Sequence, residues 1–462
     1  MPAPLDRVME MVPFYDPEER VLPVGRTPVP LDFASWAEPV DSANITSADW
    51  RKLAEIIREK QNEYAGFVIL HGTDTLAYTA SALAFILDNL DRPVVVTGSQ
   101  RPIGQPRSDA VQNLITSIEV AAARTLGATV VPEVCVFFRD RLFRGCRTTK
   151  VSATSFNAFE SPNMAPLGVA GDRLAVDEKA IARPSRLALQ ARPALDERIA
   201  CVTLFPGMST ALLDGMLNSD DLRGIVLQAF GNGNCPSTPQ FLNAVAGAVE
   251  AGRLIVDITQ CRSGEVDLGL YPGSLGLLSR GVIPGMDMTP EAALAKLSFL
   301  LGNEADALVV ADRMQINMRG EQRQSVFNLH FGAGEVAAGE SVTLRPVRPM
   351  VAGSRYRSSA LDRAVLRVLG LSSPAPEPDA ALECRLWLDS AAPGPGAEEG
   401  VGFLGRISSG RRGIDGKGNA ILEVTEQVRA LVDNRHINTL TVAAGGGGVS
   451  WDRLDLALYA DC

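Results

Sequence analysis

Short apolar runs alternate with amphipathic stretches along the first third of the chain. Between the runs at residues 66–70 and 93–97, apolar positions recur at helical spacing. They predict a helix with one buried face, made by Leu83, Ile86, Leu87 and Leu90. A further helix is expected near residues 109–123. The runs themselves are typical of strands buried on both faces of a parallel sheet, and they cover residues 66–70, 93–97 and 130–138. This alternation of strand and helix predicts an α/β domain.

Two helix starts carry capping signals. Thr46, with an acidic residue three positions later, predicts a surface helix over residues 49–60. Thr289 followed by Pro290 predicts a helix over residues 290–301, because proline is favoured at the first helical position.

The alternation of strand and helix returns after residue 198. Three strand-like runs separated by helical stretches predict a second α/β block, with strands at residues 199–204, 224–228 and 254–259. The preceding residues 166–197 contain several prolines and few periodicities. We therefore expect one α/β domain over residues 1–165, a linker over 166–197 and a second α/β domain over 198–332.

After residue 332 the pattern changes from helical spacing to alternation. Alternating runs predict half-buried strands at residues 341–345, 383–388 and 454–459. A stretch rich in Pro, Ala and Gly covers residues 372–399, and four consecutive glycines occupy residues 445–448. We expect an appended β-rich domain over residues 333–462.

Composition narrows the function classes. The 462 residues suggest about three domains. A net charge of −10 without a basic stripe argues against a nucleic-acid partner. The three histidines and the absence of a Cys-x-x-Cys pair argue against a metal site. Without a leader-like start or a long apolar span, we expect a cytoplasmic protein that does not contact a membrane.

The segment from His71 to Thr75 follows a predicted strand and opens a predicted helix. Ligands bind at such strand ends in parallel sheets, and a Thr hydroxyl beside an Asp could attack or orient a small polar substrate. The alternative is helix capping by Thr73 or Thr75. Farther along, Lys150 closes an Arg-Thr-Thr-Lys segment. Such a lysine can serve as the base for a Thr hydroxyl, and the alternative is an ordinary surface lysine.

Three more polar segments are turns when each is taken alone. They are residues 41–44, residues 97–102 and residues 231–234. The last of these lacks the Gly-x-Gly-x-x-Gly spacing, so it gives little support for a nucleotide site.

The order of these segments is more informative than any one of them. They succeed one another as Asp41-Ser42 before a helix, His71-Gly72-Thr73-Asp74-Thr75, Thr97-Gly98-Ser99-Gln100-Arg101-Pro102, Arg107-Ser108-Asp109 with Asn113-Leu114, and Arg147-Thr148-Thr149-Lys150. In this order the chain resembles the bacterial L-asparaginase family, specifically its cytoplasmic type I branch, over residues 5–320.

The resemblance implies hydrolysis of the side-chain amide of asparagine, or of a similar small amide, without a cofactor or metal. It implies that Thr73 acts with Asp74 and Lys150. It also implies that Ser42 binds the substrate α-carboxylate with help from the Gly72 backbone. Asp74 would pair with the α-ammonium, and the Ser99 backbone would line the amide. The family further implies a homo-oligomer. An acyl transfer of this kind needs a nucleophile, a base and fixed dipoles for the oxyanion.

The sequence also departs from the family pattern. It contains no Thr-Gly-Gly-Thr, the segment that holds the usual nucleophile, and Ala43 and Ala110 stand where the family has a polar residue and a glycine. We expect the segment to be supplied by another chain, to be lost, or to be missing through a misassigned start. Residues 438–445 superficially resemble the missing strand and its turn, but Ala and Gly stand where the nucleophilic Thr is needed. The alternative function is a catalytically impaired relative that binds a small amino acid or a protein partner.

The appended residues 341–460 resemble the C-terminal domain of plant-type polyphenol oxidases. The shared features include the strand Leu386-Trp387-Leu388-Asp389 and Gly402-Phe403-Leu404-Gly405. This resemblance implies a β-sandwich, and with three histidines the chain is not itself the copper enzyme. We expect residues 333–462 to mediate docking, either to another copy of this chain or to another protein partner. The expected fold class is α/β, with two Rossmann-like parallel-sheet domains and a C-terminal β-sandwich.

Overall fold

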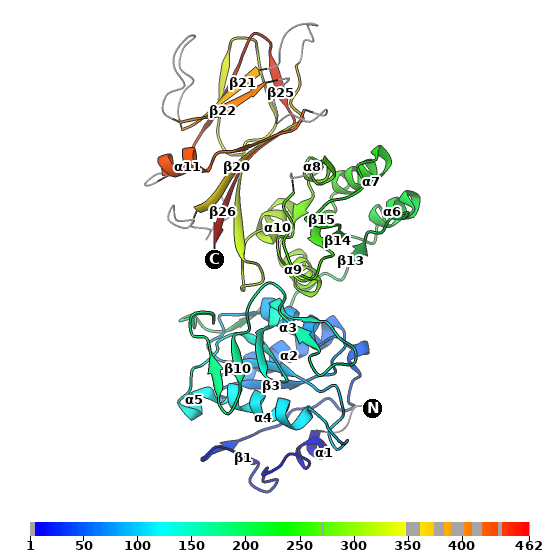
Figure 1. The fold of residues 1–462 in the computed structure, drawn as a ribbon, viewed down its shortest axis with the longest axis vertical. Helices are drawn as coiled ribbons and strands as arrows, with labels where there is room; N and C mark the ends of the chain where they lie inside the picture. Colours follow the sequence, from blue (N-terminus) through cyan, green and yellow to red (C-terminus); the bar gives the residue numbers. More distant parts are fainter. Residues whose placement is uncertain are drawn as a thin grey trace.

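The chain arranges as two α/β units followed by a β-rich unit. The computed structural model describes residues 5–268, 272–347, 361–373, 383–389, 402–408, 418–432 and 437–461. Figure 1 shows the first unit in blue to cyan, the second in green and the β-rich unit in yellow to red. Within the described residues, no helix is both long and apolar enough to cross a membrane.

The first unit is built on a mixed six-stranded sheet. Three of its strands are parallel, namely β3 (Phe67–Leu70), β5 (Val94–Thr97) and β6 (Val134–Phe138). The other three extend the sheet antiparallel, namely β7 (Arg141–Arg144), β10 (Gly168–Ala170) and β11 (Leu174–Val176). The strand order is β11-β10-β7-β6-β5-β3. Residues 168–176, which the sequence placed in a linker, therefore contribute two strands to this sheet.

Helices cover the first sheet: α2 (Ser47–Lys60), α3 (Leu76–Ile86), α4 (Ala110–Ala121) and α5 (Ala123–Leu126). The expected cap of α2 is confirmed, since Thr46 donates from N and Oγ1 to Asp49 Oδ2 at 2.9 and 2.8 Å. The expected helical face that continues to Leu90 is wrong. α3 ends at Ile86 because β4 (Leu87–Asp88) pairs with β12 (Gln190–Ala191).

The first residues pack beneath this unit. After α1 (Leu5–Met9), β1 (Val21–Val24) and β2 (Thr27–Pro30) form a hairpin. Leu22 and Val29 of the hairpin join one buried cluster with Leu114 and Ile118 of α4, and Figure 1 shows the hairpin below that helix.

The second unit has a four-stranded parallel sheet. Its strands lie in sequence order as β13 (Ile199–Thr203), β14 (Gly224–Ala229), β15 (Leu254–Thr259) and β16 (Ile283–Pro284). The helices are α6 (Thr210–Leu217), α7 (Pro239–Glu250), α8 (Pro272–Leu278), α9 (Pro290–Asn303) and α10 (Ala307–Met314). The three expected strands and the expected cap of α9 are confirmed, since the Thr289 hydroxyl accepts from Ala292 N at 3.2 Å.

The β-rich unit contains two four-stranded antiparallel sheets. One has the order β17 (Gln324–His330), β26 (Arg453–Asp461), β20 (Leu361–Leu369) and β23 (Ala420–Glu423). The other has the order β19 (Ser341–Leu344), β24 (Leu440–Ala444), β21 (Glu383–Leu388) and β22 (Phe403–Ser408). Both sheets contribute to one buried cluster. The unit also has α11 (Thr425–Val432) and the pair β18 (Gly334–Val336) and β25 (Val449–Trp451).

The three strands expected in this unit are confirmed. Because β24 pairs with β19 and β21, residues 438–445 do not substitute for a strand of the first sheet. Most of the stretch 372–399 lies outside the described residues.

Buried side chains join neighbouring units. α3 packs against α9, and Phe85 stacks on Phe299 with ring centroids 6.2 Å apart. Every residue of α3 except Tyr78 is buried, so the prediction of a helix with a single buried face is wrong: the second unit covers its other side. The β-rich unit meets the second unit through a smaller cluster that includes Met286, Val365 and Tyr459.

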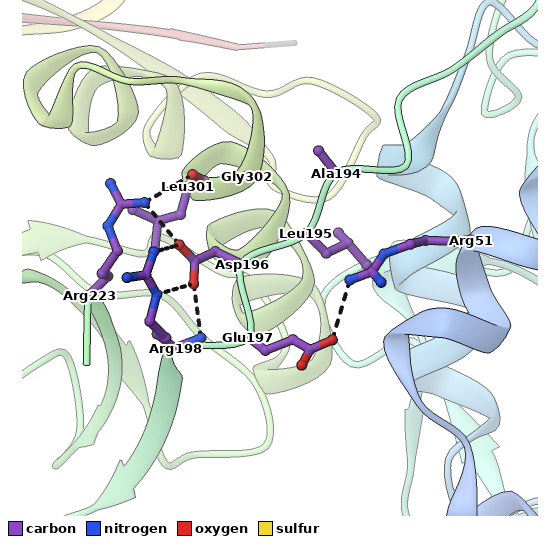
Figure 2. Close-up of a pocket in the computed structure, with 9 residues that line it drawn as sticks. All are labelled: Arg51, Ala194, Leu195, Asp196, Glu197, Arg198, Arg223, Leu301 and Gly302. Carbon is purple, nitrogen blue, oxygen red and sulfur yellow. Dashed lines mark hydrogen bonds and ion pairs between the residues drawn. The ribbon is translucent and has the colours of Figure 1, made fainter. Parts of the chain in front are cut away.

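An ion-pair network spans the connection between the two α/β units. Figure 2 shows Asp196 between the guanidinium groups of Arg198 and Arg223, at 2.8 and 2.9 Å, and Glu197 reaching Arg51 of α2 at 3.3 Å. An open hollow of about 690 Å³ lies here. Because the charged groups that line it pair with one another, the hollow presents no unpaired ionic group to a ligand.

Candidate active site

The site begins where β3 ends. β3 is an edge strand that pairs with β5 among the described strands, and its Leu70 is 40% exposed. The expectation that residues 66–70 are buried on both faces is therefore wrong, whereas the residues of β5 are fully buried. A strand with a neighbour on one side leaves its other edge uncovered. The segment His71–Thr75 follows directly.

Thr73, Asp74 and Lys150 come together at this strand end. Lys150 lies on β8 (Thr149–Lys150), which pairs with β9 (Phe159–Glu160). Its Nζ donates to Thr73 Oγ1 at 2.9 Å and to Asp74 Oδ1 at 2.6 Å. The Lys150 side chain is 18% exposed and that of Asp74 is 69% exposed. The cluster thus pairs a largely covered ammonium with a hydroxyl and with a carboxylate that faces solvent.

Thr75 occupies the N-cap position of α3, but these contacts give the side chains of the two motifs other partners. Lys150 is bonded and mostly covered, so it is not an isolated surface lysine. Neither Thr caps α3 by its side chain. The Thr75 hydroxyl donates to the Ser42 carbonyl at 2.7 Å, and the Thr73 hydroxyl donates to Gln100 Oε1 at 3.3 Å.

Ser42 and Gly72 are in close approach. Ser42 belongs to the short 3₁₀ helix η1 (Ser42–Asn44), which Asp41 caps, and is 5% exposed. A Cβ on Gly72 would lie 2.6 Å from Ser42 Oγ. A side chain at position 72 would therefore push Ser42 away, so glycine is what allows the two segments to meet.

Ser99 lies on the loop that follows β5, where it is half-buried. This loop reaches the cluster through Gln100. Asp109, at the N-cap position of α4, holds the loop, because it accepts from the backbone N of Gln100 and of Arg101, both at 3.0 Å. Asn113 donates to Gly98 O at 2.9 Å.

His71 is held in one tautomer by its neighbours. Its Nδ1 lies 2.7 Å from Gly72 O, a carbonyl that only accepts, so Nδ1 carries the proton. Its Nε2 then accepts from the Thr79 hydroxyl at 2.8 Å, which itself accepts from Trp50 Nε1. Burial lowers the pKa of His71, so the imidazole is neutral and orients the Gly72 carbonyl.

Two family models match most of the α/β region. "Asparaginase, N-terminal" covers residues 26–182, and "Glutaminase/Asparaginase C-terminal domain" covers residues 198–314. The chain belongs to the asparaginase family. It is an asparaginase-like amidohydrolase of the type I bacterial kind, and the comparisons give no support to the alternative of a catalytically impaired relative.

The similarity to individual proteins lies in this same part of the chain. The chain is 42% identical to L-asparaginase 1 of Escherichia coli over 282 residues, which is 61% of this chain and 82% of that protein. It is 39% identical to the human 60 kDa lysophospholipase over 283 residues, which is 61% of this chain and 48% of that protein. The solved L-asparaginase I from Vibrio cholerae matches with a TM-score of 0.57 and 40% identity, covering 62% of this chain and 84% of the other.

Two residues that shape this candidate site were not assigned to it from the sequence. Asp109 and Asn113 were noticed only as family motif residues, although their contacts hold the loop beside Thr73.

The large hollow of Figure 2 shares no lining residue with the Thr73 cluster. A smaller cavity of about 300 Å³ lies between the two α/β units, and Lys150 is among the residues that line it.

Proposed function

We propose that the asparaginase reaction of this chain takes place at Thr73, Asp74 and Lys150. The observation that carries the proposal is the contact of Lys150 Nζ with both Thr73 Oγ1 and Asp74 Oδ1. A base within hydrogen-bond distance of a hydroxyl is the arrangement that nucleophilic and general-base catalysis requires.

Lys150, after releasing one ammonium proton to solvent, takes the Thr73 hydroxyl proton while Thr73 Oγ1 bonds to the amide carbon. When the C–N bond breaks, Lys150 returns this proton to the departing nitrogen, and ammonia leaves. Water then cleaves the acyl ester. In a second route the same pair orients a water molecule that attacks directly, and no ester forms.

Substrate-binding roles follow from the surroundings of this cluster. We assign the α-carboxylate of asparagine to Ser42 and the Gly72 backbone, which lie against each other. The α-ammonium is assigned to Asp74, whose carboxylate is largely exposed, and the side-chain amide to the Ser99 backbone. The substrate in this proposal is asparagine, the amino acid named for the relatives, or a similar small amide.

Ammonia release from asparagine tests the assignment. We expect Thr73→Ala to lower kcat by about a hundredfold or more, and Thr73→Ser to retain a measurable part of it. Mass spectrometry of an acid-quenched reaction separates the two routes, because only the first gives an acyl adduct on Thr73. Unchanged activity in both Thr73→Ala and Lys150→Ala contradicts the roles. Activity that requires a second polypeptide would instead indicate a nucleophile supplied by another chain.

The remaining parts of the proposal concern assembly. We propose a cytoplasmic homo-oligomer, with residues 333–462 as a β-sandwich that docks a protein partner. Two sheets that share one buried cluster support the sandwich. The division into units near residues 166–197 and 333 is kept, with β10 and β11 assigned to the first unit and β17 to the third. Light scattering of the purified full chain tests the oligomer.

A further inference from the structure

The segment that leads to Lys150 is held by side chains of the second α/β unit. Arg147, three residues before Lys150, is 5% exposed. It donates from Nη1 to Asp287 Oδ2 at 2.6 Å and from Nε to Gly320 O at 2.7 Å. Asp287 also accepts from Arg323 N at 2.8 Å through its other oxygen. The backbone before Lys150 is therefore tied to residue 287 by a buried ion pair.

A second contact lies one residue before Lys150. The Thr149 hydroxyl donates to Glu291 Oε1 at 2.8 Å. Glu291 is 6% exposed, and burial raises the pKa of its carboxyl. Hydrogen bonds from the side chain of Thr149 and from the backbone of Lys150 act in the opposite direction on this pKa. Glu291 therefore contacts the strand of Lys150 from within the second unit.

The same segment of the second unit touches the β-rich unit. Met286 is 4% exposed and forms one cluster with Val365 and Tyr459 of β20 and β26. Its backbone has φ of +54°, a conformation that residues with a Cβ rarely adopt. Such a backbone needs packing that holds it, and the β-rich unit provides that packing. Nearby, Arg363 of β20 donates to Asp267 Oδ2 at 2.9 Å.

We propose that residues 286–291, called the link segment below, set the position of Lys150 and couple this position to the packing of the β-rich unit. The proposal rests on the catalytic role proposed for Lys150. Within six residues, Met286 meets the β-rich unit, Asp287 holds Arg147 and Glu291 holds Thr149. Contiguous packed contacts of this kind are the physical route by which one unit can bias a site in another. The packing of the β-rich unit thereby affects the activity at Lys150. Glu291 is a positioning residue, since it acts on Lys150 through Thr149.

The first test acts on Glu291. We expect Glu291→Ala and Thr149→Val each to lower kcat by about tenfold or more with little change in KM, since misplacing a catalytic group by about 1 Å can cost about a hundredfold. Glu291→Gln should retain most of the activity, because the amide oxygen still accepts from Thr149. Thr149→Ser should retain it for the same reason. A kcat within twofold of the parent in both Glu291→Ala and Thr149→Val overturns the positioning role.

The second test acts on the β-rich unit with a matched pair. Val365→Ala removes two methyl groups at the cluster with Met286, and Val442→Ala removes the same groups from the other sheet. Both residues are at most 2% exposed. At a temperature where circular dichroism finds both variants folded, we expect kcat to fall several-fold in Val365→Ala alone. Equal kcat values in the two variants overturn the transmission.

A double variant and a reference variant complete the design. Combining Val365→Ala with Glu291→Ala should lower kcat by less than the product of the single effects, because both act through one segment; a full product contradicts a shared route. Lys150→Ala distinguishes a failure of the proposed catalytic site from a failure of the link segment. If it keeps full activity, the proposed site fails; if it is inactive while Val365→Ala and Glu291→Ala keep kcat, only the link fails.

Discussion

His330 should stabilise the junction between α10 and the β-rich unit in a way that depends on pH. Its Nδ1 lies 2.7 Å from Asp455 Oδ1 on β26, and its Nε2 lies 3.1 Å from Asp312 Oδ1 on α10. Burial opposes the charged imidazole, but the two carboxylates outweigh it and raise the pKa of His330 to about 9. His330 is therefore a cation that donates from both ring nitrogens at neutral pH.

The magnitude follows from linkage. His330 has a raised pKa in the folded chain, so its stabilisation is fully present below the unfolded value of 6.5 and is lost as pH rises through about 9. Each unit by which the pKa in the folded chain exceeds that in the unfolded chain corresponds to about 1.4 kcal/mol, so protonated His330 stabilises the fold by about 3 kcal/mol. The neutral isostere His330→Gln should lose that amount near pH 6 and lose much less above pH 10.

Two measurements check this. The chain has three histidines, so three imidazole Cε1 signals can be followed by NMR, with His330→Gln assigning one of them. We expect that signal to titrate near pH 9. Urea unfolding at pH 6 and pH 10, compared between parent and variant, gives the free-energy difference. A titration midpoint at or below 6.5, or a difference in unfolding free energy that is equal at both pH values, refutes the reasoning.

Three further predictions concern the site and its supports. Gly72→Ala should raise KM for asparagine about tenfold or more by displacing Ser42, whereas Gly215→Ala, where no heavy atom lies within 4 Å of the added Cβ, should leave steady-state kinetics unchanged. Asp109→Ala should lower kcat because the loop after β5 loses two backbone hydrogen bonds; an unchanged kcat would show that this loop does not need them. Arg147→Met should lower the unfolding free energy by about 3 kcal/mol or more, because Asp287 is left buried without its partner, and urea unfolding measures this loss.

Local signals in the sequence predicted the start of a helix well where residues within one turn determine it. Thr46 with Asp49, and Thr289 with Pro290, fix helix starts through contacts within one turn, so their sequence is sufficient. The prediction failed where distant pairing decides. Residues 66–70 have the composition of a buried strand, but β3 lies at an edge of the sheet. Likewise, Leu87 leaves the helical pattern because residue 191 pairs with it.

The residues of the candidate site also fall into those that the sequence predicted and those that it did not. Thr73, Asp74 and Lys150 were found because the order of motifs matches a family, and the structure brings them into contact. Glu291 was missed, since its contact with Thr149 joins residues 142 positions apart and its own neighbours in sequence only indicate a helix start. Asp109 was noticed as part of a family motif but was assigned no role, because its contacts with Gln100 and Arg101 depend on how the loop after β5 folds back onto α4.

The central claim is that Lys150, in contact with Thr73 and Asp74, performs the proton transfers of amide hydrolysis. Steady-state ammonia release from asparagine by Lys150→Ala tests it most directly, with the exposed Lys179→Ala as the matched control. We expect a fall in kcat of about a hundredfold or more for Lys150→Ala, with an unchanged circular dichroism spectrum, and parental activity for Lys179→Ala. A Lys150→Ala chain that releases ammonia at the parental rate would contradict the account.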